Sequence, residues 1–238
     1  MMFLLRHMAS GRSGLTFRMV RLRAALFADI LKVGVPTAVN AMLSNLTVIL
    51  VTGAVGLFGT SALAGYGISS RLDYIMIPLL FGVSTATLTM VGINMGAGQT
   101  ARAGKIGRTS AVVGLLFTGT IGILVAAFPT AWLHLFSNDA EVVREGTTYL
   151  RIVAPAYSAL GFGFVASFAA QGTGRAMGPL AASLARITIA AGGGWIAVTS
   201  FGAGMTGLAT LVAASLIAYA AVCAAIILPR SIWRPESG

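Results

Sequence analysis

Long stretches without a charged residue constrain this chain more than any other feature. Five of them lie at residues 33–70, 74–101, 109–138, 152–174 and 187–229. Only 9% of the 238 residues are charged, against about 25% in an ordinary soluble domain. A bilayer core is crossed by about 20 helical residues, so each stretch can supply at least one membrane span. The sequence therefore predicts a membrane protein.

Glycine-rich segments divide the first and the last of these stretches. They read "GTSALAGYG" at residues 59–67 and "GAGMTG" at residues 202–207. We therefore predict six spans, at residues 33–57, 66–95, 109–133, 148–171, 178–201 and 205–228. Backbone groups in lipid must be hydrogen-bonded within their own segment, and short glycine-broken connections suit helices rather than a barrel. The predicted fold class is an all-α membrane protein whose six transmembrane helices form one lobe.

The basic residues gather where a cytoplasmic face is expected. The net charge is +10, and Arg residues crowd the first 23 positions. If that arm is cytoplasmic, alternation of the six spans puts most Lys and Arg on the same side, and both termini with them. Predicted anchors of this face are Arg102, Lys105, Arg108 and Arg175. Nucleic-acid binding is the alternative reading of a basic arm, but contact with anionic headgroups of the bilayer accounts for it better, so we expect no nucleic-acid partner.

The glycine pair at residues 96–98 suggests a phosphate-binding loop, but the spacing around it excludes one. "VGINMGAGQTARAGKIGR" spans residues 91–108, and no acid follows it until Asp139, so the ribose partner of a dinucleotide fingerprint is missing. Five residues separate Gly98 from Gly104, and Ile106 follows Lys105, so the P-loop pattern fails twice. "QGTGRAMGP" at residues 171–179 has the same Gly-x-Gly turn before Arg-Ala. Each pair is predicted to end a helix at the cytoplasmic face.

The residues that carry enzyme chemistry are scattered. The single Cys223 lies in the last predicted span, and His7 and His134 are far apart and on opposite predicted faces. No grouping of Ser, His and acid emerges, and no Cys-ligated metal site can form. We therefore expect no catalytic residues, no metal and no cofactor.

Polar side chains recur on one face of two spans. In the first span they are spaced by three, four and three residues, which places them on one helical face: Thr37, Asn40, Ser44 and Thr47. Such a face should meet other helices or a cavity; packing remains open for the Thr and Ser positions, and a cavity is favoured for Asn40 and Gln171. The candidate cavity residues of the two spans are Asn40, Ser44, Thr47, Tyr157, Phe164 and Gln171.

Very few charged residues lie at or within the spans, and two of them are candidates for a functional role. Asp73, in "SRLDY", is expected to orient the helix mouth at a water interface together with Arg71, with ion binding as the alternative. Arg186 is expected to reach the cytoplasmic headgroups, with a polar cavity as its alternative. Pro36, Pro78 and Pro155 are expected to bend their spans.

A series of segments resembles one transporter family. "LKVGVPTAVNAML", "YGISSRLDYIMIPLLFG", "GINMGAGQTARA", "LFSNDAEVVREGTTYLRIVAP" and "FAAQGTGRAMGP" occur in the order and spacing of the multidrug and toxic compound extrusion (MATE) family. The resemblance is to its carboxy-terminal lobe. It implies an antiporter of a bacterial inner (plasma) membrane, which exports small cationic or amphiphilic compounds in exchange for Na⁺ or H⁺ by alternating access between two six-helix lobes.

The resemblance also implies a division of the chain. Residues 1–8 resemble the end of a preceding span, 9–28 a basic inter-lobe linker, 29–229 the lobe itself and 230–238 a cytoplasmic tail. The expected partner is an amino-terminal six-helix lobe or a second copy of this chain.

The coupling group is the point of departure from the family. Some relatives carry a carboxylate on the first helix of this lobe, eight residues after its proline, where Ser44 stands here; others carry it in the other lobe. The coupling group is therefore unknown, with Asp73 as a weak candidate. The alternatives to an antiporter are a vestigial or structural fragment without transport, and a lipid-linked saccharide flippase of the same superfamily. Flippase cavities carry several basic residues, whereas this chain offers only Arg186.

Overall fold

The computed structural model describes residues 24–233. The chain divides into two units, 1–32 and 33–238, and the arrangement described below is that of the second unit. The segment 1–8, most of the linker expected at 9–28 and the end of the tail expected at 230–238 lie outside the described residues. Within residues 24–233, the first helix begins at Ala24, inside the segment expected to be linker.

In the described part of the chain, six helical spans, as predicted, are long and apolar enough to cross a membrane. They are Leu31–Gly56, Thr60–Gly96, Thr100–Ala127, Ala140–Gly172, Met177–Phe201 and Met205–Ile227. The predicted all-helical fold class is confirmed. The elements are α2 (Ala24–Gly56), α3 (Thr60–Gly96), α4 (Thr100–Ala127), α5 (Pro129–Leu133), α6 (Ala140–Val153), the 3₁₀ turn η1 (Ala154–Ala156), α7 (Tyr157–Gly172), α8 (Met177–Ile187), the π turn η2 (Thr188–Gly193), α9 (Gly194–Phe201), α10 (Met205–Ile227) and the 3₁₀ turn η3 (Arg230–Trp233).

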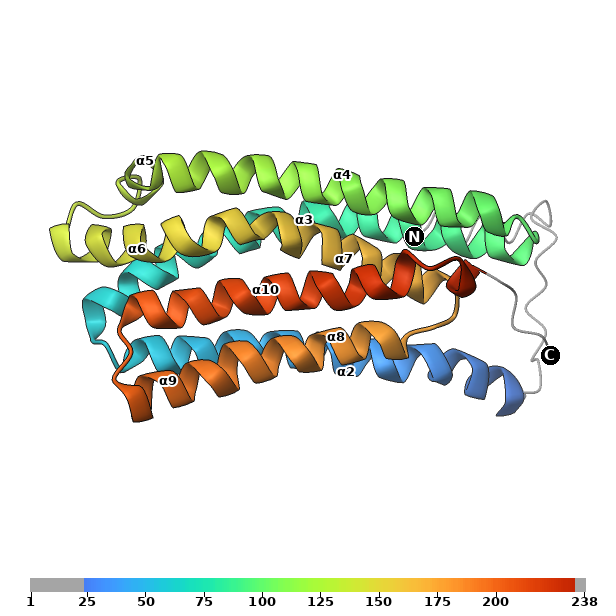
Figure 1. Cartoon of the computed structure of the whole chain (residues 1–238), viewed down its shortest axis with the longest axis horizontal. Coiled ribbons are helices and arrows are strands. Elements are labelled where there is room, and N and C mark those ends of the chain that lie inside the picture. Colours follow the sequence, from blue (N-terminus) through green and yellow to red (C-terminus); the bar gives the residue numbers. More distant parts are fainter. Residues whose placement is uncertain (1–23, 234–238) are drawn as a thin grey trace, which may run out of the picture. The chain divides into compact units, whose positions relative to one another are not determined.

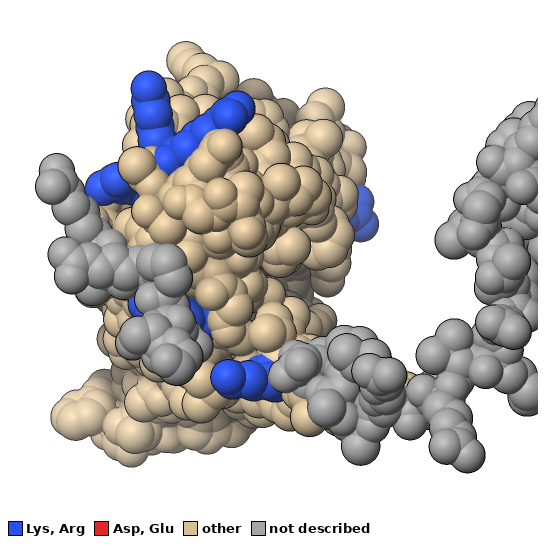
Figure 2. Space-filling model, turned by 90° about the vertical axis from the view of Figure 1, so that its right-hand side faces the viewer, with Lys and Arg blue, Asp and Glu red and all other residues tan. Residues whose placement is uncertain are grey.

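The helices of the second unit run lengthwise beside one another, so their connections gather at two ends (Figure 1). We call the end formed by residues 96–108 and 172–177 the basic end, because it carries the four predicted anchors. Figure 2 looks onto this end and shows Lys and Arg side chains but no Asp or Glu among the described residues. We call the opposite end, formed by residues 57–60, 134–145 and 202–205, the acidic end. Asp139, Glu141 and Glu145 lie there.

Both Gly-x-Gly pairs end a helix at the basic end, as predicted. Helix α3 ends at Gly96, and Gly98 takes a φ of 71°; α7 ends at Gly172, and Gly174 takes a φ of 83°. In both turns an amide reaches back five residues, Gln99 N to Asn94 O at 2.8 Å and Arg175 N to Ala170 O at 3.3 Å. This is the Schellman pattern of helix ends, in which the left-handed position favours glycine.

Two spans are interrupted near their middle. Pro155 lies in η1, which separates α6 from α7, because proline cannot donate the hydrogen bond that would continue an α-helix. The fifth span changes from α8 to the π turn η2 and back to α9, a break that the sequence analysis did not predict. Pro36 and Pro78 lie inside α2 and α3. Interrupted helices of this kind often occur at functional sites.

The span made by α6, η1 and α7 is the centre of the lobe. In its most apolar window 61% of residues are buried, against 22–33% in the other spans. Glycines allow its close contacts: a Cβ at Gly114 of α4 would lie 2.7 Å from Gly161 O of α7, and one at Gly65 of α3 would lie 2.7 Å from Gly146 N of α6. Without a hydrophobic driving force in lipid, close backbone packing of this kind holds helices together.

Asp139 fixes the start of the central span at the acidic end. Its carboxylate accepts hydrogen bonds from Glu141 N at 2.8 Å and Val142 N at 3.1 Å. We expect Asp139→Ala to lower the free energy of unfolding by about 1 kcal/mol, because two amides of the first turn lose their acceptor. Thermal unfolding in detergent measures the change. Asn138→Ala, at the neighbouring exposed residue, is the control, and an equal loss in both variants would contradict a capping role.

Candidate functional site

A small cavity lies inside the lobe, where five of the six spans meet. Its lining residues are Thr47, Val48 and Val51 of α2, Tyr66 and Asp73 of α3, Tyr149 and Val153 of α6, Tyr157 and Leu160 of α7, Arg186 of α8, Ala190 of η2, and Val212, Ser215 and Leu216 of α10. The volume of about 30 Å³ suits one or two water molecules or a small ion. A drug-sized ligand needs a pocket of at least about 300 Å³, so this cavity is an ion-sized site.

Asp73 enters the cavity from α3. It lies thirteen residues after Thr60, the first residue of the helix, or about 20 Å along the axis. The expected position at a water interface is therefore wrong: α3 begins six residues earlier than predicted and carries Asp73 into the lobe. Arg71, two residues earlier, is exposed, and its guanidinium carbon lies 4.5 Å from the centre of the Phe136 ring. The two side chains thus leave α3 in different directions.

Arg186 enters the cavity from α8. Its side chain is half-buried, and its Nε is buried without a hydrogen-bond partner among the described residues. The expected reach to the headgroups is therefore wrong, and the alternative, a polar cavity, is what the structure shows. The physical reason is the opposite charge across the cavity, since Arg186 is the charged group that interacts electrostatically with Asp73.

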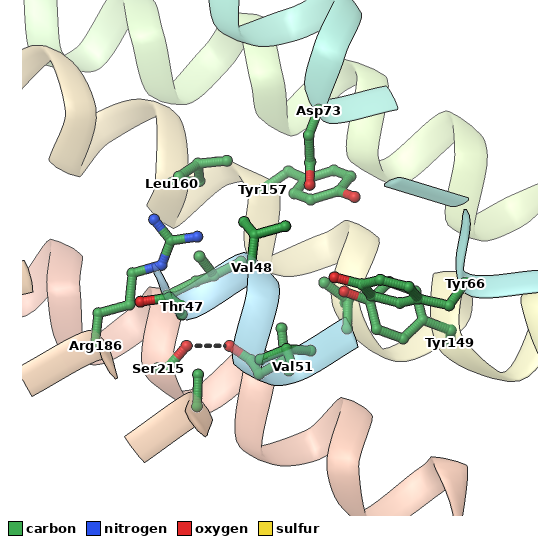
Figure 3. A pocket seen from close by; sticks show the side chains of 14 residues that line it. Thr47, Val48, Val51, Tyr66, Asp73, Tyr149, Tyr157, Leu160, Arg186 and Ser215 are labelled. Carbon is green, nitrogen blue, oxygen red and sulfur yellow. Dashed lines mark hydrogen bonds between the residues drawn. The ribbon is translucent and has the colours of Figure 1, made fainter. Parts of the chain in front are cut away.

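The two charges do not form a direct ion pair. Within the described residues, the ion pairs are those of Arg144 with Glu141 and Glu145. Asp73 Oδ1 is buried without a hydrogen-bond partner in this part of the chain. Figure 3 shows Asp73 and Arg186 extending from different helices, with Tyr157 beside Asp73. Opposite charges are thus held apart in an apolar interior, an arrangement that is costly unless something binds between them.

Hydroxyl groups complete the polar lining. Tyr157 lines the same cavity as Asp73, and its hydroxyl is buried without a hydrogen-bond partner among the described residues. The hydroxyls of Thr47 and Ser215 donate to backbone oxygens of their own helices, at 2.7 Å and 2.6 Å. Because those protons are engaged, the oxygens retain lone pairs for a cation. Oxygen ligands of this kind are what hard cations prefer.

The structure brings together two of the six candidate cavity residues. Thr47 and Tyr157 line the cavity. Gln171 lies fourteen residues beyond Tyr157, toward the basic end, where its Oε1 accepts a hydrogen bond of 3.0 Å from Thr37 Oγ1. Ser44 Oγ donates to Asn40 O at 3.1 Å, and Asn40 Oδ1 is buried without a partner among the described residues.

Phe164 belongs to an aromatic cluster away from the ion-sized cavity. Its ring centre lies 5.2 Å from that of Phe168, which in turn packs edge-on against Phe81. Tyr66, Tyr149 and Ser215 were not predicted as cavity residues, and neither was the presence of Asp73 and Arg186 in the same lining. A signal for that shared position was available, because isolated charges of opposite sign in apolar spans usually face each other.

The hydrogen bond between Thr37 and Gln171 ties α2 to the central span. We expect Thr37→Val to lower the free energy of unfolding by about 1 kcal/mol, because the buried Gln171 loses its donor. Thermal unfolding in detergent checks this. Thr120→Val is the matched control, since the exposed Thr120 hydroxyl donates only to Leu116 O of its own helix. Equal losses in both variants would contradict the tie.

The family model described as MatE matches residues 36–196. This chain belongs to the MATE family. The family consists of transporters, which agrees with the expectation that the chain is not an enzyme. Among the described residues no group of three or more His, Cys, Asp or Glu could hold a metal ion.

Individual relatives agree with the family and show how much of a transporter is present. The chain is 26% identical over 152 residues to the probable multidrug resistance protein NorM of Thermotoga maritima, covering 64% of this chain and 33% of the relative. It is 25% identical over 173 residues to the FAD transporter of Shewanella oneidensis, covering 73% and 38%. The fold resembles the MATE transporter VcmN of Vibrio cholerae in its bent form, with a TM-score of 0.80 and 18% identity, covering 97% of this chain and 53% of that structure. The chain spans about a third of those relatives and about half of the solved structure.

Proposed function

We propose that this chain is one lobe of an ion-coupled antiporter that exports cationic or amphiphilic compounds. Membership of the MATE family supports the class of transporter, since relatives of this chain include a probable multidrug resistance protein. The match to about half of a solved MATE structure supports the role of a single lobe. The second lobe is an amino-terminal six-helix lobe or a second copy of this chain. A fragment without transport and a saccharide flippase remain its competitors.

The observation that carries the coupling role is the unpaired carboxylate of Asp73 in the ion-sized cavity. Desolvation of a carboxylate in an apolar interior costs free energy, so a carboxylate at such a position indicates a functional role. Asp73 binds the coupling ion in this proposal, and Thr47 and Tyr157 contribute oxygen atoms around it. Asn40, Ser44, Phe164 and Gln171 then remain candidates for a substrate surface shared with the second lobe.

The orientation follows from the charges at the two ends. The basic end, with Arg102, Lys105, Arg108 and Arg175, faces the cytoplasm in this proposal, and the acidic end faces outward. The cell membrane of a bacterium is the proposed location, in line with the bacterial relatives.

Export of a fluorescent cation from cells that lack their own pumps tests the proposal. The chain is expressed alone and together with an amino-terminal MATE lobe, after its presence in the membrane is confirmed. We expect dye export with both lobes present, and its loss when the ion gradient is dissipated. Export by the chain alone would favour a second copy as partner. No export in any combination would favour the fragment without transport.

A further inference from the structure

The lobe holds one negative and one positive charge in the lining of the same ion-sized cavity. Asp73 comes from α3 and Arg186 from α8, and both line the cavity of about 30 Å³. Asp73 Oδ1 and Arg186 Nε are each buried without a hydrogen-bond partner among the described residues. Among the described residues, no direct ion pair joins the two side chains.

The other carboxylates whose side chains the structure describes lie at the acidic end and have partners there. Glu141 and Glu145 pair with Arg144 at the acidic end, and the carboxylate of Asp139 caps α6. The groups that face Asp73 in the cavity are Arg186 and the hydroxyls of Tyr66, Tyr149 and Tyr157. Arg186 is therefore the positive charge that balances Asp73 when no ion is present.

We propose that Arg186 is a built-in competitor of the coupling cation for Asp73. This inference rests on the proposed role of Asp73 in ion binding. A small monovalent cation that enters the cavity takes over the charge balance of the carboxylate, and the guanidinium is then in excess. Arg186 thereby weakens cation binding, so that the ion is released again in each transport cycle.

The helix that carries Arg186 is interrupted next to that residue. The π turn Thr188–Gly193 begins two residues after Arg186, and its Ala190 lines the same cavity. Gly192 of this turn is exposed on the surface of the lobe, and a Cβ there would meet nothing within 4 Å. Repulsion between the bound cation and Arg186 therefore acts on the segment of the fifth span where the helix is already interrupted.

Cation binding to the purified full chain separates competition from a purely structural pair. The variants are Arg186→Gln, Arg186→Lys, Asp73→Asn and the double variant Arg186→Gln with Asp73→Asn. Radioactive Na⁺ binding measures a metal cation. The rate at which a carbodiimide modifies Asp73, located by mass spectrometry, measures protonation of the carboxyl group. The two arms distinguish Na⁺ from H⁺ as the ion.

Competition predicts that Arg186→Gln binds the cation at least about tenfold more tightly than the original chain, because a nearby positive charge has been removed. In the Na⁺ arm this is a lower half-saturating concentration; in the H⁺ arm it is faster modification of Asp73. Arg186→Lys should resemble the original chain, and both variants that lack Asp73 should bind nothing. A role of Arg186 in folding alone would give no gain in affinity.

The contrary outcomes are separable. Unchanged or weaker cation binding by folded Arg186→Gln, with binding lost in Asp73→Asn, overturns the competition and leaves the role of Asp73 standing. Cation binding that persists in Asp73→Asn overturns both. If Arg186→Gln does not fold in buffer without Na⁺, rescue by Na⁺ but not by choline, or by lower pH in the H⁺ case, supports the inference. The inference is overturned if neither Na⁺ nor lower pH restores folding of Arg186→Gln while the double variant folds.

Discussion

Replacing Asp73 by Asn is expected to abolish gradient-driven export by the assembled transporter. The substitution keeps the size of the side chain and removes the negative charge that faces the cavity. Because a cation needs that charge to leave water for an apolar interior, the gradient-dependent rate should fall at least about tenfold. The measurement is dye export from cells that lack other pumps, with equal amounts of protein in the membrane.

The matched control is Asp139→Asn at the acidic end. It removes the same charge from an exposed residue, and Asn caps a helix about as well as Asp does. Export by this variant should be unchanged. Full gradient-dependent export by Asp73→Asn would show that the coupling ion binds elsewhere. In that case the second lobe is where to look for the coupling group.

Gly161→Ala is expected to destabilise the lobe strongly. A Cβ at this position of α7 would collide with Thr118 Oγ1 and with the backbone oxygen of Gly114 on α4. Thr118 Oγ1 also donates to Tyr157 O at 2.7 Å, so the collision disturbs the segment that holds Tyr157 at the cavity. We expect the free energy of unfolding to fall by about 3 kcal/mol, because backbone atoms cannot move aside as a flexible side chain can.

Gly82→Ala is the matched control for this close contact. Gly82 is also within a membrane helix, but a Cβ there would meet nothing within 4 Å. Alanine favours the helix more than glycine does, so the variant should be as stable as the original chain or slightly more stable. Thermal unfolding in detergent compares the two. A melting temperature of Gly161→Ala equal to that of Gly82→Ala would contradict the close packing of α4 and α7.

The six spans could be predicted from the sequence because membrane helices follow from the length of apolar segments alone. The helix ends just before Gly98 and Gly174 could be predicted as well, since a glycine pair followed by a basic residue is a local signal. The π turn Thr188–Gly193 could not, because "TIAAGG" differs little from an ordinary apolar helix. Its course depends on packing against other helices.

The polar cavity was only partly predictable, for a reason of geometry. Helical periodicity places Thr47 on an inward face, but it does not say which residue of another helix lies opposite at the same depth. The positions of Asp73 and Arg186 depend on where α3 and α8 begin, and a start six residues earlier than predicted carried Asp73 into the lobe. Asn40 and Gln171 share the polar faces of Thr47 and Tyr157, yet they lie outside the lining of the cavity.

Transport by purified protein in lipid vesicles is the most direct test of whether this chain is one lobe of an ion-coupled antiporter. The chain is reconstituted with a second six-helix lobe, a Na⁺ or H⁺ gradient is imposed, and movement of a fluorescent cation against it is followed in time. We expect dye movement that starts when the gradient is imposed, stops when an ionophore collapses the gradient, and requires both lobes. Dye movement that ignores the gradient, or none with both lobes folded in the membrane, would contradict an ion-coupled antiporter.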